Sequence, residues 1–159
     1  MTVLIAGAGI GGLTLALSLH QAGVPVRVFE SSAEIRPLGV GINLLPHAVR
    51  ELDELGLLDE LDELGVRTAE LAYYSKRGQL IWSEPRGAAA GYRWPQISLH
   101  RGKLQMMLLA AVKARLGNDS VVTGRHLDDW RESGNTVTAG FTDKRSTAAR
   151  GEVSGSLLI

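Results

Sequence analysis

Three glycines and one glutamate near the N-terminus have the types and spacing needed to hold a nucleotide. The apolar run Val3–Ala6 leads into Gly7, Gly9 and Gly12, and Glu30 follows at the end of a second apolar run. Gly7 permits a sharp turn, Gly9 leaves the backbone open to phosphate oxygens, and Gly12 lets a helix approach a strand. A carboxylate at position 30 accepts hydrogen bonds from ribose hydroxyls. The pattern therefore predicts a dinucleotide site.

The elements around these residues are those that such a turn requires. Residues 10–21 carry apolar side chains with helical spacing, and Gly23 and Pro25 follow as a stop signal. A second strand is expected to begin near Val26. A glycine-rich turn that only opens a helix, with Glu30 as a solvated strand end, is the simpler alternative. The order and spacing of these elements, a strand, a helix, a second strand and then the acid, favour a Rossmann-like α/β fold with a parallel sheet.

Beyond Glu30 the chain alternates loops, helices and strands. A loop is expected over residues 31–41, and a helix opened by Pro46 should end at Gly56. The near copies at residues 52–56 and 61–65 predict two amphipathic helical turns, each closed by glycine. The remaining predictions are strands at 71–74, 79–82 and 97–100, a helix at about 103–116, and strands at 121–123, 127–132 and 135–142 with a hairpin turn at 133–135.

Composition narrows the class of protein. The 159 residues are 45% hydrophobic, enough for one domain with its own core, and 17 basic residues balance 17 acidic ones. With neither a basic stripe nor a stacking platform, no nucleic-acid partner is expected. The absence of cysteine excludes disulfides, and no segment predicts a membrane span, so a cytoplasmic location is expected. The four histidines lack metal-ligand spacing, so neither a metal nor a catalytic residue is assigned.

Four segments, residues 4–13, 34–43, 82–87 and 95–106, together carry a family resemblance. They resemble the N-terminal part of class A FAD-dependent aromatic monooxygenases, the group of para-hydroxybenzoate and salicylate hydroxylases. Within that class the likeness is greatest to phenazine monooxygenases. The first segment is generic to flavoproteins, whereas the other three together are more specific.

The resemblance implies a fold and an activity. The fold would be an FAD-binding domain of the glutathione-reductase type, a parallel sheet with added antiparallel strands, incomplete at the C-terminus. Residues 1–159 would be its N-terminal part, and residues 70–100 would start the sheet on the substrate side. The activity would be hydroxylation of a small aromatic or heteroaromatic substrate with O2, FAD, and NADH or NADPH.

The resemblance also assigns residues to FAD, one position at a time. The assigned roles are pyrophosphate binding for Gly7, Gly9 and Gly12, the adenosine ribose for Glu30, the cofactor phosphates for Arg36, the isoalloxazine or ribityl chain for Gly41, FAD contact for Arg101, and backbone contact with adenine for Leu127. Structural alternatives are a solvated charge at Arg36, an ion pair at Arg101 and a core side chain at Leu127. A cation at a helix start is unfavourable without an anionic partner, which favours the FAD role for Arg101.

Members of the resembled family continue well beyond this length, whereas this chain ends in an expected apolar strand at residues 155–159. The chain is therefore expected to be a fragment that is inactive alone. Two other functions remain open: a non-catalytic FAD- or ADP-binding module and an NAD-dependent dehydrogenase. The dinucleotide turn and Glu30 serve NAD equally well, but residues 36–43 fit flavoproteins better.

Overall fold

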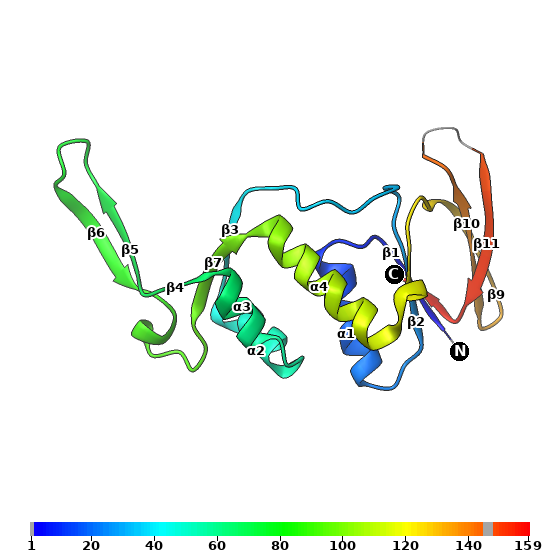
Figure 1. The fold of residues 1–159 in the computed structure, drawn as a ribbon, viewed down its shortest axis with the longest axis horizontal. Coiled ribbons are helices and arrows are strands. Elements are labelled where there is room, and N and C mark those ends of the chain that lie inside the picture. Colours follow the sequence, from blue (N-terminus) through cyan, green and yellow to red (C-terminus); the bar gives the residue numbers. More distant parts are fainter. Residues whose placement is uncertain (1, 145–147) are drawn as a thin grey trace. The chain divides into compact units, whose positions relative to one another are not determined.

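The structure is a computed structural model that describes residues 2–144 and 148–159. It divides into two compact units (Figure 1). The first comprises the described residues of Met1–Pro37 and Gln105–Ile159, and the second comprises Leu38–Leu104. Each unit has its own sheets and its own buried side chains.

A four-stranded parallel sheet forms the centre of the first unit. Its strands, in spatial order, are β12 (Leu157–Leu158), β1 (Val3–Ala6), β2 (Val26–Phe29) and β8 (Val121–Val122). Helix α1 (Ile10–Gln21) connects β1 to β2 and buries Leu13, Ala16 and Leu17, which share one helical face. Gly23 ends the helix with φ +74°, as a left-handed cap requires.

A three-stranded antiparallel sheet packs against the parallel one. Its order is β11 (Ala149–Gly155), β10 (Thr136–Thr142) and β9 (His126–Ser133). Leu4 and Phe29 of the parallel sheet form one buried cluster with Ala139 and Phe141 of β10. The rings of Phe29 and Phe141 stack with centroids 4.5 Å apart. This cluster joins the two sheets into one core.

The second unit combines a small sheet, two helices and a hairpin. Its elements are the antiparallel sheet β3 (Gly41–Leu44), β7 (Gln96–His100) and β4 (Val66–Thr68), helices α2 (Pro46–Glu54) and α3 (Leu58–Leu64), hairpin strands β5 (Glu70–Tyr74) and β6 (Leu80–Pro85), and the short 3-10 helix η1 (Gly87–Ala90). Val49, Leu61 and Ile97 are fully buried and form its core. In Figure 1 the β5–β6 hairpin projects away from α2 and α3.

Helix α4 (Arg101–Leu116) begins in the second unit, and its residues from Gln105 onward belong to the first. The short 3-10 helix η2 (Asn118–Ser120) follows it and leads into β8. The sequence predicted α4 to start near residue 103, whereas the helix starts two residues earlier. His100 explains the earlier start, because its Nδ1 accepts a hydrogen bond from the backbone N–H of Gly102 at 3.1 Å and so caps the first turn.

The fold confirms the predicted α/β class and most predicted elements, but the sequence missed three strands, β3, β4 and β11. The predicted loop at residues 31–41 ends one residue early, because Gly41 already pairs with His100 in the sheet. The short helix η1 was not predicted either.

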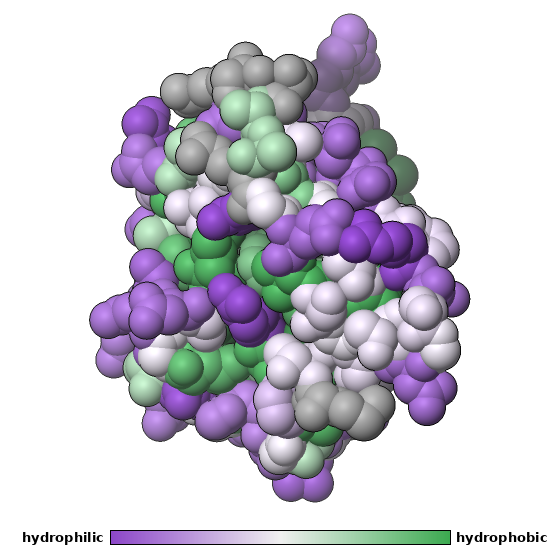
Figure 2. Space-filling model, turned by 90° about the vertical axis from the view of Figure 1, so that its right-hand side faces the viewer, coloured by the Kyte–Doolittle hydropathy of each residue, from purple (hydrophilic) through white to green (hydrophobic). Residues whose placement is uncertain are grey.

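The surface of the molecule is mixed rather than uniformly polar. Figure 2 shows one face on which hydrophobic residues emerge between hydrophilic ones. In the first unit, Trp130, Leu157 and Ile159 are each more than half exposed. Side chains of β9 and of the C-terminal residues therefore contribute hydrophobic area to the surface.

Candidate nucleotide site

The turn between β1 and α1 has the backbone geometry that its glycines predict. Gly7 has φ +115°, a conformation that residues with a side chain rarely adopt. The Gly7 N–H donates to the carbonyl oxygen of Phe29 at 2.7 Å, which ties the turn to β2. A methyl group on Gly12 would collide with the carbonyl oxygen of Gly7, whereas one on Gly9 would meet nothing within 4 Å. Gly12 thus allows the close approach, and Gly9 leaves open space.

The first turn of α1 faces outward with its backbone donors free of side-chain caps. Gly9 is the N-cap residue, no side chain in the described part of the chain caps the helix, and no acidic residue lies in its first turn. Gly9 and Gly11 are exposed. The first N–H groups of a helix carry partial positive charge and attract anions. This end of α1 therefore suits a pyrophosphate.

Glu30 joins this turn to the end of β2 through both of its carboxylate oxygens. Its Oε2 accepts a hydrogen bond from the backbone N–H of Ala8 at 2.9 Å. Its Oε1 accepts one from the backbone N–H of Ser32 at 2.7 Å and one from the Ser31 hydroxyl at 3.2 Å. The carboxylate is therefore held beside the glycine turn in a fixed orientation.

These hydrogen bonds also control the charge of Glu30. Partial burial, the largest single influence, acts to raise its pKa, but the hydrogen bonds from Ser32, Ala8 and Ser31 together outweigh it. The pKa of Glu30 consequently lies below its ordinary value of 4.5. The side chain is an ionised hydrogen-bond acceptor at neutral pH, as ribose binding requires.

Gln105 is a member of the site that the sequence did not single out. Its side-chain N–H from α4 donates to the carbonyl oxygen of Ala8 at 2.8 Å. Ala8 is thus held on both sides, by Glu30 through its N–H and by Gln105 through its carbonyl. Gln105 lies within residues 95–106, one of the segments that carry the resemblance, and that was the available signal.

Two other predicted residues of the first unit have structural partners. Arg36 pairs with Glu34 at 2.7 Å, and both side chains are about two-thirds exposed. Leu127 lies in β9, pairs with Phe141 of β10, and packs partly buried against the core cluster. Their structural partners do not test the binding roles, which stay predictions.

Gly41 and Arg101 both belong to the second unit. Gly41 is the first residue of β3, and Arg101 is the first residue of α4. Gly41 is opposite His100 in the sheet, and the backbone N–H of Arg101 donates to the carbonyl oxygen of Val40 at 3.0 Å. No described carboxylate forms an ion pair with Arg101. Its guanidinium lacks the acidic partner that a cation at a helix start was expected to need.

Neither a cluster of metal ligands nor a membrane-spanning helix is found in residues 2–144 and 148–159. No three potential metal ligands among His, Asp and Glu gather there. None of the helices described is both long and apolar enough to span a membrane.

Comparison with known proteins identifies the class to which the fold and the turn belong. The family described as FAD binding domain matches residues 1–159, so the chain belongs to this family. The predicted resemblance to FAD-dependent monooxygenases is confirmed.

Individual relatives refine this assignment. The chain is 53% identical to phenazine 1,6-dicarboxylic acid hydroxylase of Lysobacter antibioticus over 82% of its length, and 33% identical to aurachin C monooxygenase/isomerase of Stigmatella aurantiaca over 100%. It is also similar to the crystal structure of Klebsiella pneumoniae HpxO complexed with FAD and uric acid, with a TM-score of 0.80, 29% identity and 99% coverage of this chain. The matches span 32%, 39% and 38% of the respective relatives.

Proposed function

We propose that the protein is an FAD-dependent monooxygenase component that hydroxylates an aromatic or heteroaromatic substrate with O2 and NADH or NADPH. The observation that carries the proposal is the ionised Glu30, held by Ala8 at the uncapped start of α1. Relatives named for action on phenazine 1,6-dicarboxylic acid and urate support the substrate class. The cysteine-free composition is compatible with the proposed cytoplasmic location.

The first unit would hold the adenosine diphosphate half of FAD. Gly7, Gly9 and Gly12 would leave the free N–H groups of α1 open to the pyrophosphate. Glu30 would accept hydrogen bonds from the ribose hydroxyls. The side chain of Arg36 would bind the phosphates once its ion pair with Glu34 is broken. The backbone of Leu127 would contact the adenine.

The second unit would contribute flavin contacts and the beginning of a substrate region. We propose that Gly41 and Arg101 contact the flavin part of FAD, and the absence of a described acidic partner for Arg101 supports this. Residues 70–100, which include the β5–β6 hairpin, would start the substrate-side sheet. When bound, FAD would supply the redox chemistry of the hydroxylation, with O2 and NADH or NADPH as co-substrates.

The chain spans about a third of the length of the relatives that it matches. We therefore propose that these 159 residues bind FAD but do not hydroxylate a substrate alone. The NAD-dependent dehydrogenase alternative lacks the support that family membership gives to FAD.

The experiment is an FAD titration of the purified chain, followed by an assay with NADH or NADPH, O2 and phenazine-1,6-dicarboxylate. Saturable FAD binding without an oxygenated product is the expected result. Turnover by the chain alone would refute the fragment proposal while supporting the reaction class. Absence of turnover in the natural polypeptide that carries this sequence would leave a non-catalytic FAD-binding module.

A further inference from the structure

The peptide bond between Ala8 and Gly9 connects the glycine turn to the first N–H groups of α1. Its carbonyl oxygen accepts a hydrogen bond from the side-chain amide of Gln105 at 2.8 Å. Gln105 is part of α4 and belongs to the same compact unit as the turn, although it lies 97 positions later in the chain than Ala8. The contact is therefore a tertiary one that fixes a single backbone group.

Two successive peptide bonds of the turn are held by side chains from different parts of the first unit. Glu30 accepts a hydrogen bond from the N–H of Ala8 at 2.9 Å, and Gln105 donates one to the carbonyl oxygen of Ala8. Ala8 is fully buried between them, whereas Gly9 is exposed. Glu30 thus orients the peptide that precedes Ala8, and Gln105 orients the peptide that follows it.

Gly9 by itself permits more than one orientation of the Ala8–Gly9 peptide. Rotation of a peptide plane changes ψ of the residue before it and φ of the residue after it, and glycine tolerates φ of either sign. A methyl group on Gly9 would meet nothing within 4 Å, so the space around this residue does not select one orientation. The hydrogen bond from Gln105 does select one.

The orientation of this peptide decides which backbone atom an anion would meet. The bond is trans, and in a trans peptide the carbonyl oxygen and the N–H point to opposite sides. Because Gln105 binds the carbonyl oxygen of Ala8, the N–H of Gly9 points away from Gln105. No acceptor among the described residues binds this N–H. A free N–H attracts a phosphate, whereas a carbonyl oxygen in its place would repel one.

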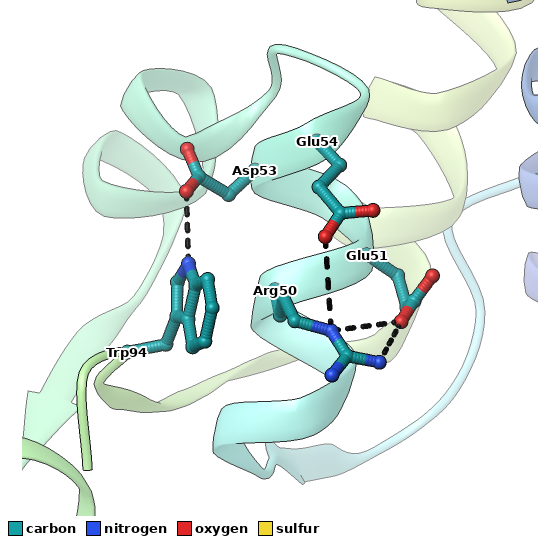
Figure 3. Close-up of polar contacts among 5 residues, drawn as sticks. All are labelled: Arg50, Glu51, Asp53, Glu54 and Trp94. Atoms are coloured by element: carbon teal, nitrogen blue, oxygen red, sulfur yellow. Dashed lines mark hydrogen bonds and ion pairs between the residues drawn. The ribbon is translucent and has the colours of Figure 1, made fainter.

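A long-range hydrogen bond in the second unit offers a comparison. The indole N–H of Trp94 donates to Oδ2 of Asp53 at 2.8 Å (Figure 3). This bond joins two side chains, so its loss does not release a backbone peptide. The Gln105–Ala8 bond has the same length but ends on a backbone carbonyl oxygen. The Trp94–Asp53 bond therefore provides a matched control for the loss of a single tertiary hydrogen bond.

We propose that Gln105 is a positioning residue for the pyrophosphate of FAD. Its amide holds the carbonyl oxygen of Ala8 away from the anion and keeps the N–H of Gly9 directed toward it. Gln105 acts through the Ala8–Gly9 peptide rather than by touching the cofactor. This role rests on the proposed FAD site and adds to it the side chain that sets the orientation of its backbone.

Gln105→Met tests this role, because it removes the amide donor while keeping the side chain long. Displacement of FAD by ADP and by adenosine, followed by flavin fluorescence, gives the affinity of each protein for the two ligands. ADP carries the pyrophosphate, and adenosine lacks it. We expect the variant to bind ADP at least about tenfold more weakly than the parent and adenosine within about twofold, as for the loss of a hydrogen bond to a charged group.

Trp94→Phe is the control, because it removes the donor of the Trp94–Asp53 bond and should leave both affinities unchanged. Equal affinity for ADP in the parent and in a folded Gln105→Met would overturn the role of Gln105. Equal losses for ADP and adenosine would overturn it as well, since they indicate a general structural effect. A parent that binds neither FAD nor ADP would refute the proposed FAD site, and the positioning role with it.

The amide proton of Gly9 provides a test that needs no variant. An N–H that donates to a phosphate oxygen forms a short, charge-assisted hydrogen bond, which moves its proton resonance downfield. In spectra of the parent, ADP should shift the Gly9 amide proton downfield, and adenosine should not. A Gly9 resonance that stays in place while ADP shifts those of Ile10 and Gly11 would overturn the assigned orientation.

Discussion

At the scale of single residues, Glu30 combines a structural role with a proposed binding role. Its two oxygens already accept hydrogen bonds from Ala8, Ser32 and Ser31. An ionised carboxylate has about four acceptor positions, so about one remains for a ribose hydroxyl. The same contacts that hold the turn also orient the acceptor.

Glu30→Gln tests this arrangement. The amide loses the negative charge and an acceptor oxygen, so we expect FAD affinity to fall about tenfold or more, as for other hydrogen bonds to charged groups. FAD fluorescence titration measures the change. Glu63→Gln, on the exposed surface of α3, is the control. Equal affinity of the Glu30 variant and the parent would refute the ribose role.

The lowered pKa of Glu30 predicts a pH dependence of stability. A carboxylate whose pKa is depressed in the folded state stabilises the fold above its unfolded pKa, and this contribution is lost as pH falls through the folded value. The unfolding temperature of the parent should therefore exceed that of Glu30→Gln at pH 7. The gap should close as pH falls from about 4.5 toward the lower folded pKa. A gap that stays constant between pH 7 and pH 3 would contradict the account.

Gly12 and Gly11 form a matched pair at the start of α1. Gly12→Ala should cost about 1–3 kcal/mol, because the methyl group collides with the carbonyl oxygen of Gly7. Gly11→Ala meets nothing within 4 Å and should stabilise the helix by up to about 1 kcal/mol. Urea unfolding of both variants provides the comparison. Similar stabilities for the two would exclude close packing as the reason for Gly12.

The sequence predicted the parts of the site that depend on local spacing. A single strand-turn-helix-strand pattern contains Gly7, Gly12 and Glu30. This pattern alone predicts that the three residues lie close together in space. The Ala8–Gln105 contact joins residues 97 positions apart, and no local pattern predicts such a pair.

At the scale of elements, the Phe29–Phe141 contact holds the antiparallel sheet on the parallel one. Phe141→Ala should cost about 3–5 kcal/mol, since both rings are almost fully buried and the cavity left behind would be lined by apolar groups. Trp130→Ala, at a 59% exposed position of the same sheet, should change stability by no more than about 0.5 kcal/mol. Equilibrium unfolding in urea measures both, and equal losses would show that this cluster is not the main sheet contact.

Elements with strong local signals were predicted, and elements defined by distant partners were not. Helix α1 has the predicted bounds, because a helical apolar face and a glycine stop both lie within its own sequence. Strand β3 has no comparable local signal, because its residues alternate between exposed and half-buried positions. Its partner strand, β7, lies much later in the chain. Strand β4 is three residues long, too short for a periodic pattern.

At the scale of the whole molecule, family membership covers all 159 residues, whereas the chain spans about a third of the relatives' length. The fold of the family thus covers the entire chain, whereas the proposed reaction is not assigned to these 159 residues alone.

The most direct test of the central claim is a titration of FAD with the purified 159-residue chain, followed by flavin fluorescence. The account predicts saturation at one FAD per chain, weaker binding by Glu30→Gln, and no comparable binding of NAD. FAD that remains free at high protein concentration, or NAD bound as tightly as FAD, would contradict it.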